Sequence, residues 1–277
     1  MSATVFFIVI STAAFHAGWN AIVKGSGDKT ASAVAICIAA SLMAAVTLPM
    51  VAQPARPSWP FIAGSVGLQT VYYMLVAAAY SRVDMSQAYP IMRGGAPLIV
   101  AVLAGLLFGE VLPPLAWFGV LLISGGIAGI AALGRSGSGA GLAFALTNAL
   151  VIATYTLCDG FGVRQSSAPV GYTLWIFLLT APPVLVWAFS RRGPALVGQL
   201  AGQWRVGLIG GVGTMVSYGA ALWAMTHAPV AMVAALRETS ILFATAISAF
   251  VLGEKVGLGR TAAVAVVAGG AALLRLA

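Results

Sequence analysis

The sequence carries very little charge. Only 7% of its 277 residues are Asp, Glu, Lys or Arg, whereas 61% are hydrophobic. A soluble domain typically has about 25% charged residues, so this chain lacks the polar groups needed to cover a surface exposed to water. Its hydrophobic residues form runs of about 20, the length with which a helix crosses roughly 30 Å of hydrocarbon. We therefore expect an all-α integral membrane protein, since backbone groups in lipid must be hydrogen-bonded within the chain.

Cysteine and histidine are also scarce. Cys37 and Cys158 are the two cysteines, His16 and His227 the two histidines, and their spacing fits neither a disulfide framework nor a metal site. No phosphate-binding loop, zinc-protease motif or nucleophile elbow is present. We predict no catalytic residue, no metal and no cofactor, so an intramembrane enzyme is disfavoured. The 14 basic residues exceed the 6 acidic ones, and their place in loops indicates headgroup contact and not nucleic-acid binding.

The hydrophobic runs divide into ten predicted membrane spans. With an even number of spans, both termini lie on the same side. Lys and Arg concentrate in the odd-numbered loops, which predicts that these loops are cytoplasmic and that both termini are periplasmic in a bacterial inner membrane. The spans are 3–23, 30–52, 60–80, 85–108, 114–133, 140–162, 169–190, 205–226, 228–252 and 256–275.

An internal repeat relates the two halves of the chain. Three features recur with a constant offset of 144 residues: Arg93 as Arg237, Gly109-Glu110 as Gly253-Glu254, and Gly125-Gly126 as Gly269-Gly270. Each half holds five spans, an odd number, so the second half must be inserted upside down. We predict a first repeat at 1–133, a linker at 134–139 and an inverted repeat at 140–277, around a central cavity as in secondary transporters.

Two arginines occur near mid-depth of predicted spans. Arg93 and Arg237 each cost roughly 2.5–3.5 kcal/mol there on insertion scales, so each needs an acidic partner or a water-filled cavity. Two interpretations stay open: internal ion pairs with Asp159 or Glu238, or binding of a substrate carboxylate. Pro90 predicts a kink in span 85–108 alone, because no proline follows Val230. We expect Pro90, Gly94 and Gly95 to form a hinge.

Polar and aromatic side chains recur at helical spacing in several spans. They indicate either a substrate cavity or hydrogen bonds between helices, worth about 0.6 kcal/mol each. His16, Asp159 and Glu238 are candidates for proton or ion coupling. Glu110 and Glu254 are interpreted as structural residues at helix ends, Arg164, Arg191 and Arg192 as topology charges, and Trp59, Trp117, Trp187 and Trp204 as interfacial anchors. The predicted substrate-binding residues are His16, Trp19, Asn20, Tyr73, Tyr89, Arg93, Asn148, Tyr155, Thr156, Tyr218, Trp223 and Arg237.

Three segments resemble a known family. "HAGWNAIVK" at 16–24, "APLIVAVLAGLLFGEVL" at 96–112 and "ILFATAISAFVLGEKV" at 241–256 are similar to bacterial drug/metabolite transporters of the EamA type. The resemblance implies ten helices around a cavity and, most often, export of amino acids or related metabolites. We therefore expect a monomeric secondary transporter whose partners are a small-molecule substrate and the lipid bilayer. Uptake or facilitated diffusion of another metabolite, and a non-transporting receptor or structural protein, stay as alternatives.

Overall fold

The computed structural model describes residues 1–24, 28–80, 82, 85–132, 139–251, 253 and 256–277, and within them every regular element is a helix. Short 3₁₀ turns at Leu48–Met50 and Arg56–Ser58 lie between α2 and α3. The α-helices are α1 (Ala3–Lys24), α2 (Lys29–Thr47), α3 (Trp59–Tyr80), α4 (Met85–Phe108), α5 (Pro114–Ala132), α6 (Gly139–Ser166), α7 (Pro169–Arg192), α8 (Ala195–Gly202), α9 (Trp204–Met225), α10 (Val230–Arg237), α11 (Ser240–Phe250) and α12 (Leu258–Leu276).

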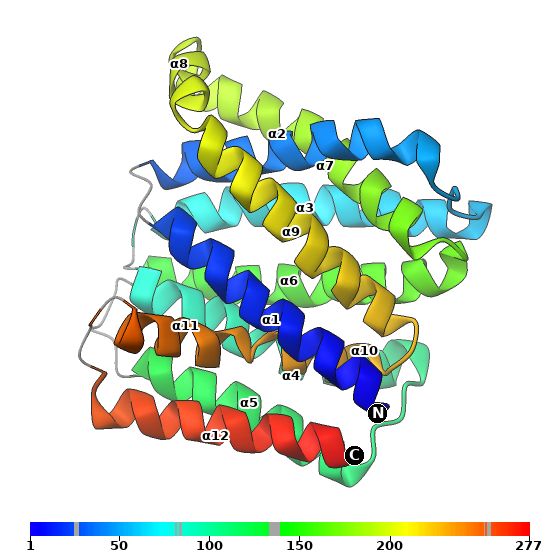
Figure 1. Ribbon diagram of the computed structural model, residues 1–277, viewed down its shortest axis with the longest axis vertical. Coiled ribbons are helices and arrows are strands. Elements are labelled where there is room, and N and C mark those ends of the chain that lie inside the picture. Colours follow the sequence, from blue (N-terminus) through cyan, green and yellow to red (C-terminus); the bar gives the residue numbers. More distant parts are fainter. Residues whose placement is uncertain (25–27, 81, 83–84, 133–138, 252, 254–255) are drawn as a thin grey trace.

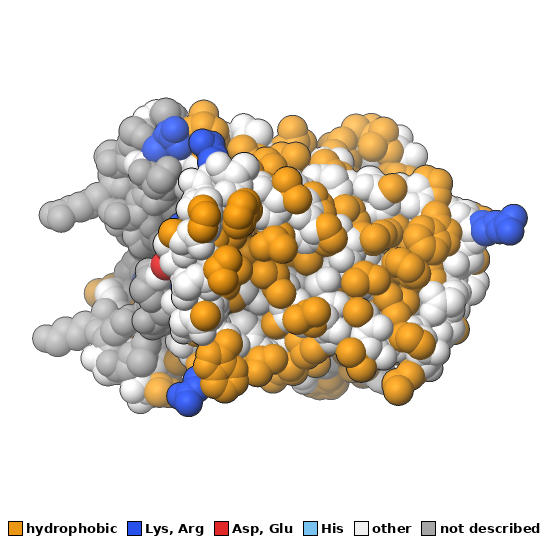
Figure 2. Space-filling view, turned by 90° about the horizontal axis from the view of Figure 1, so that it is seen from above, with side chains coloured by type: hydrophobic (Ala, Val, Ile, Leu, Met, Phe, Trp, Pro, Cys, Tyr) orange, Lys and Arg blue, Asp and Glu red, His pale blue; other side chains and the backbone are white. Residues whose placement is uncertain are grey.

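The helices form a bundle with ten spans long and apolar enough to cross a membrane, as predicted. Nine spans are single helices, and α10 with α11 makes the tenth, Val230–Phe250. The short helix α8, which the sequence pattern did not predict, lies in the connection between α7 and α9. Large apolar side chains such as Leu106 and Phe118 are exposed on the outside, and Figure 2 shows hydrophobic side chains spread across one face. Such a surface suits lipid and not water.

Both termini lie at the same end of the bundle (Figure 1), and the Arg275 guanidinium donates to the Met1 carbonyl at 3.3 Å. We call this end the terminal face. It also carries the end of α6 and the start of α10. The opposite end, where α1 ends and α2 begins, is called the distal face. Because the helices alternate in direction, the α7–α8–α9 connection lies at the distal face (Figure 1).

The helix break in the structure falls in a different span from the predicted kink. α4 runs unbroken through Pro90, whereas the span without a proline breaks at Glu238 and Thr239, between α10 and α11. Pro90 lies in the second turn of α4, where one missing amide is tolerated because neighbouring helices hold the rest. At the break, the amides of Glu238 and Thr239 bond three residues back, and the Thr239 hydroxyl donates to the Leu236 carbonyl at 2.6 Å. These bonds satisfy backbone amides and carbonyls that the break removes from the regular helical hydrogen bonds.

α4 is continuous through the expected hinge at Pro90, Gly94 and Gly95, which stays a prediction; the two glycines allow close helix packing. A Cβ on Gly94 would lie 2.9 Å from Ile127 of α5, and one on Gly95 would lie 3.5 Å from Ala149 of α6. The missing side chains let α5 and α6 approach the α4 backbone.

One pair of helices and one pair of glycines repeat at the offset found in the sequence. α12 begins and ends 144 residues after α5 (114 to 258, 132 to 276), and the two helices pack side by side (Figure 1). Gly109 and Gly253 share a φ of +65°, a left-handed conformation that glycine adopts without strain. At the α5–α12 contact, Gly119 lies against Gly270, and Gly126 against Ala263. The predicted linker at 134–139 lies almost wholly outside the described residues.

Candidate functional site

A cavity of about 480 Å³ enters the bundle from the distal face. It begins beside Lys29 and Thr30 in the first turn of α2 and extends inward to Arg93 and Arg237. None of the described residues that line it belongs to the helix ends at the terminal face. Its walls come from α1, α2, α3, α6, α7 and α9, with the arginines of α4 and α10 at its inner end.

Most of the predicted binding residues meet in this cavity. Eight of the twelve line it, three lie elsewhere, and one falls outside the described residues. Asn148 is buried elsewhere and donates to the Met92 sulfur at 2.9 Å, whereas Trp223 packs on His227 with ring centroids 4.4 Å apart near the terminal face. Thr156 borders a separate void of about 10 Å³, and the Tyr89 side chain lies outside the described residues. The eight lining residues are His16, Trp19, Asn20, Tyr73, Arg93, Tyr155, Tyr218 and Arg237.

Other residues of the cavity had been interpreted differently or overlooked. Trp187, expected as an interfacial anchor, lines the cavity on α7. Phe177 of the same helix and Ser217 of α9 also line it. The sequence of an apolar span does not show whether a Trp or Phe side chain lines a cavity or contacts lipid. Only the packing of α7 against α2, α3 and α9 turns these side chains inward.

Arg93 forms an internal ion pair with Glu238. Arg93 Nε lies 2.9 Å from Oε2 of Glu238, and its Nη2 lies 2.8 Å from Oε1, a two-point contact between α4 and the end of α10. The two side chains are only 14% and 9% exposed. Breaking a buried pair of this kind leaves one uncompensated charge and costs about 3–5 kcal/mol. Of the two interpretations of Arg93, the geometry therefore favours the internal ion pair over a free guanidinium for substrate.

Arg237 has a different environment, although it is the repeat counterpart of Arg93. Its guanidinium lies over the ring of Tyr218, 5.0 Å from the centroid, and it forms no ion pair with a described residue. A guanidinium held by an aromatic face keeps its N–H donors available in the plane of the group. The cavity lining holds both arginines and no described acidic residue, so its inner wall carries positive charge.

Aromatic rings line the way to these charges. Edge-to-face contacts connect Tyr73 to Tyr72, Tyr72 to Tyr155 and Tyr155 to Tyr218, with centroids 5.5, 5.9 and 6.5 Å apart. Trp19 packs edge-on against His16 at 5.1 Å, and its buried indole N–H has no hydrogen-bond partner among the described residues. A buried donor without a partner is costly, and a ligand acceptor in the cavity would satisfy it.

At the terminal face, Glu110 and Arg164 tie together the ends of four helices. Glu110 Oε1 lies 3.0 Å from Arg164 Nη2 and accepts from the Val230 amide at 3.1 Å, at the start of α10. Arg164 also donates to the carbonyls of Met225 at 2.7 Å and Ala228 at 2.8 Å. Glu110 is thus a capping residue, as interpreted, but Arg164 is more than a topology charge. We call this set the terminal cluster.

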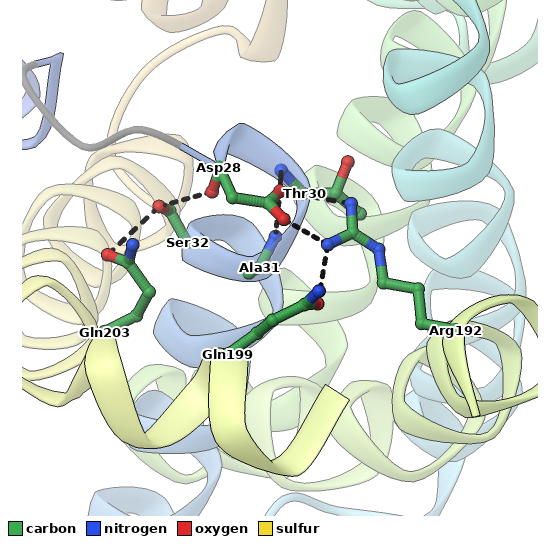
Figure 3. A network of polar contacts seen from close by, with 7 residues as sticks. All are labelled: Asp28, Thr30, Ala31, Ser32, Arg192, Gln199 and Gln203. Atoms are coloured by element: carbon green, nitrogen blue, oxygen red, sulfur yellow. Dashed lines mark hydrogen bonds and ion pairs between the residues drawn. The ribbon is translucent and has the colours of Figure 1, made fainter. Parts of the chain in front are cut away.

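At the distal face, Asp28 organises a second network beside the cavity entrance (Figure 3). Its carboxylate caps α2 through the Thr30 and Ala31 amides, at 3.0 Å each, and pairs with Arg192 at the end of α7. Arg192 also reaches Gln199 of α8 at 2.8 Å. Hydrogen bonding from Arg192 is the largest reason that the pKa of the Asp28 carboxyl lies below its usual range. Arg192 therefore holds α7 and α8 against α2.

Comparisons with known proteins agree with this architecture. Residues 139–276 match the model of the EamA-like transporter family. A solved structure described only as "Crystal structure of protein" is 18% identical and superposes with a TM-score of 0.78, covering 100% of this chain and 99% of that one. At this identity the likeness shows a shared fold. None of the curated proteins matches the chain. The family match assigns this multi-pass membrane protein to the EamA-like transporter family, whose members carry small molecules.

Proposed function

We propose that this protein is a secondary transporter that exports amino acids or related small metabolites with a carboxylate group across the bacterial inner membrane. The observation that carries the proposal is Arg237, held over the Tyr218 ring at the inner end of the cavity. A substrate carboxylate can accept two hydrogen bonds from such a guanidinium. The volume of about 480 Å³ lies within the range of small-ligand sites, which are typically about 300–1,000 Å³.

The walls fit an amphipathic substrate. Rings such as Tyr73 and Phe177 supply apolar area, and these side chains lose little rotamer freedom on binding. Trp19 supplies an N–H that has no partner among the described residues. We assign substrate contact to the eight predicted residues in the cavity, with Arg237 holding the carboxylate and Arg93 kept in place by Glu238.

Alternating access follows from the difference between the two faces. The cavity reaches the distal face, while the terminal cluster joins α4, α6, α9 and α10 beyond its inner end. If the terminal face opened while the distal face closed, substrate would be released at the terminal face. We propose that the repeats 1–133 and 140–277 move against each other, as inverted repeats in transporters do. The excess of Lys and Arg at the distal face supports a cytoplasmic cavity and periplasmic termini in a monomeric exporter.

The test is flux through the purified protein in liposomes. Efflux of candidate amino acids and other carboxylates should saturate with substrate concentration, and Arg237→Ala should reduce it at least 10-fold. Trp19→Phe, which removes the N–H donor and part of the ring area, should weaken apparent affinity more modestly.

Arg205→Ala is the matched control, because Arg205 is exposed at the start of α9 and does not line the cavity. Equal flux in Arg237→Ala and Arg205→Ala would refute the site. Binding without flux would favour a receptor, and flux that no ion gradient accelerates would favour facilitated diffusion.

A further inference from the structure

Asp159 lies one side chain behind the cavity, fully buried within α6. Its Oδ1 accepts from the Tyr172 hydroxyl at 3.3 Å, and its Oδ2 accepts from the Tyr218 hydroxyl and from Gln69 Nε2 at 3.4 Å. Every one of these donors is neutral, and Asp159 makes no ion pair with a described residue. Tyr218 and Gln69 also line the cavity.

A carboxyl group in this setting is suited to gaining and losing a proton. An ionised carboxylate in the membrane interior is costly without a cation, but three donors offset part of that cost. A protonated carboxyl keeps acceptor capacity and gains one O–H donor, which a tyrosine hydroxyl or the Gln69 amide oxygen can accept. The same side chains can therefore serve both forms by rotating hydroxyl groups.

We propose that Asp159 is the proton-binding site of the transport cycle, coupled to the substrate through Tyr218 and Arg237. This inference rests on the proposed transport function and adds its coupling ion. A proton passes from cavity water to the Tyr218 oxygen while the Tyr218 hydroxyl proton passes to Asp159 Oδ2, so tyrosine is neutral before and after. Protonation leaves the Tyr218 ring in place beneath Arg237.

Charge balance determines the sign of the coupling. The charged residues here are Arg93 and Arg237 against Glu238 and Asp159, and Arg93 is neutralised by Glu238. The positive charge of Arg237 then acts on Asp159, the carboxylate beyond the Tyr218 ring. A substrate carboxylate bound to Arg237 takes over that charge, which favours a proton on Asp159. Proton and anionic substrate therefore bind together, and each strengthens the binding of the other. Export by this route runs down the outward substrate gradient and carries the proton out with the substrate; an inward proton gradient does not drive it.

The remaining neighbours of Asp159 do not offer a competing charge. α3 contributes Gln69 and Ser65, α7 contributes Tyr172, and α9 contributes Tyr218. On α6 itself, Tyr155 and Cys158 are the nearby titratable groups. Arg237 of α10 is the cation facing this set, so its neutralisation by substrate is the change that the carboxyl would sense.

The experiment measures substrate flux and proton movement in the same liposomes. With the wild-type protein, substrate flux down its gradient should carry one proton per monoanion in the same direction and shift the pH on the receiving side. The apparent KM should rise by up to 10-fold per pH unit on the alkaline side, the limit for one linked proton. Asp159→Asn keeps the shape of the side chain, and it should exchange labelled substrate without proton movement and with a KM independent of pH.

Tyr172→Phe is the matched variant, since it removes one donor and leaves the carboxyl; it should shift the pH midpoint and keep the proton movement. His16→Gln tests the imidazole that lines the cavity. Proton-coupled flux in Asp159→Asn, or its loss in His16→Gln instead, would overturn the proposal. Saturable wild-type flux with no proton movement would also overturn it while leaving the transport function intact. If Asp159→Asn does not fold, Tyr172→Phe is the deciding variant. An unchanged pH midpoint of transport in Tyr172→Phe would refute the proposal.

Discussion

The terminal cluster makes a quantitative prediction about which face of the protein is closed. Glu110 accepts from Arg164 and from the α10 amides of Val230 and Ala231, and these bonds would have to break for the terminal face to open. We predict that Glu110→Gln shifts the equilibrium toward an open terminal face. The amide keeps one acceptor oxygen but loses the charge that strengthens all three contacts.

The size of the shift follows from the bonds lost. A hydrogen bond to a charged group contributes about 1.5–3 kcal/mol, more than a neutral one. Loss of one such contribution from the closed state raises the open-to-closed ratio about 10- to 150-fold. Arg164→Gln should produce a shift of the same order, since it removes the other charge. The double variant should be far from additive, because both changes break the same contact.

The assay is labelling of a cysteine placed behind the cluster. Ala234 on α10 is buried and borders the void near Arg237, so Ala234→Cys, in a chain with Cys37 and Cys158 replaced by Ser, reports access from the terminal face. A membrane-impermeant thiol reagent added on that side should label it about 10- to 150-fold faster in the Glu110→Gln background. Arg275→Gln is the control, since Arg275 lies at the same face but outside the cluster. Equal labelling rates in Glu110→Gln and Arg275→Gln would refute the reasoning.

Three further predictions concern packing, pH and the substrate charge. Gly126→Ala should lower stability by about 1–3 kcal/mol, because its Cβ would lie 2.7 Å from Val267. Gly129→Ala should leave stability unchanged, since the nearest neighbour of its Cβ would lie at 3.9 Å. Thermal unfolding in detergent compares the two variants. Because the folded pKa of Asp28 is lowered, its contribution to stability is complete above its ordinary pKa of about 3.9 and is lost as the pH falls toward the folded value; Asp28→Asn should remove that part of the acid response in unfolding curves. Arg237→Lys should weaken apparent substrate affinity about 10-fold in the flux assay despite keeping the charge, since an ammonium cannot bind a carboxylate at two points, and unchanged affinity would exclude that contact.

The spans were predictable because the bilayer acts on every residue in the same way. Runs of about 20 apolar residues must become helices in lipid, and the turn signals between them located all ten spans to within a few residues. The 144-residue offset located matching elements too, since Gly109 and Gly253 share one backbone conformation. Local rules were less useful inside the bundle, where Pro90 left α4 unbroken and Glu238 and Thr239 interrupted a span without proline.

The site was predictable in its residue types but not in its pairings. His16, Trp19 and Asn20 share a helical face, and that face does line the cavity. Asn148 and Trp223 satisfied the same pattern and lie elsewhere, because a helical face indicates a direction but not the neighbour it meets. Trp187 was expected at the membrane interface because it is near a loop, yet it lines the cavity.

The sequence by itself determined that the chain crosses the membrane ten times and that Arg93 and Arg237 occupy corresponding positions, since both follow from composition and spacing. Only the tertiary structure decided that Arg93 pairs with Glu238 while Arg237 rests on Tyr218. Glu238 follows Arg237 in the chain, yet its carboxylate meets Arg93 of α4 instead. Successive side chains on a helix point about 100° apart, so the packing of α4 against α10 selects the partner.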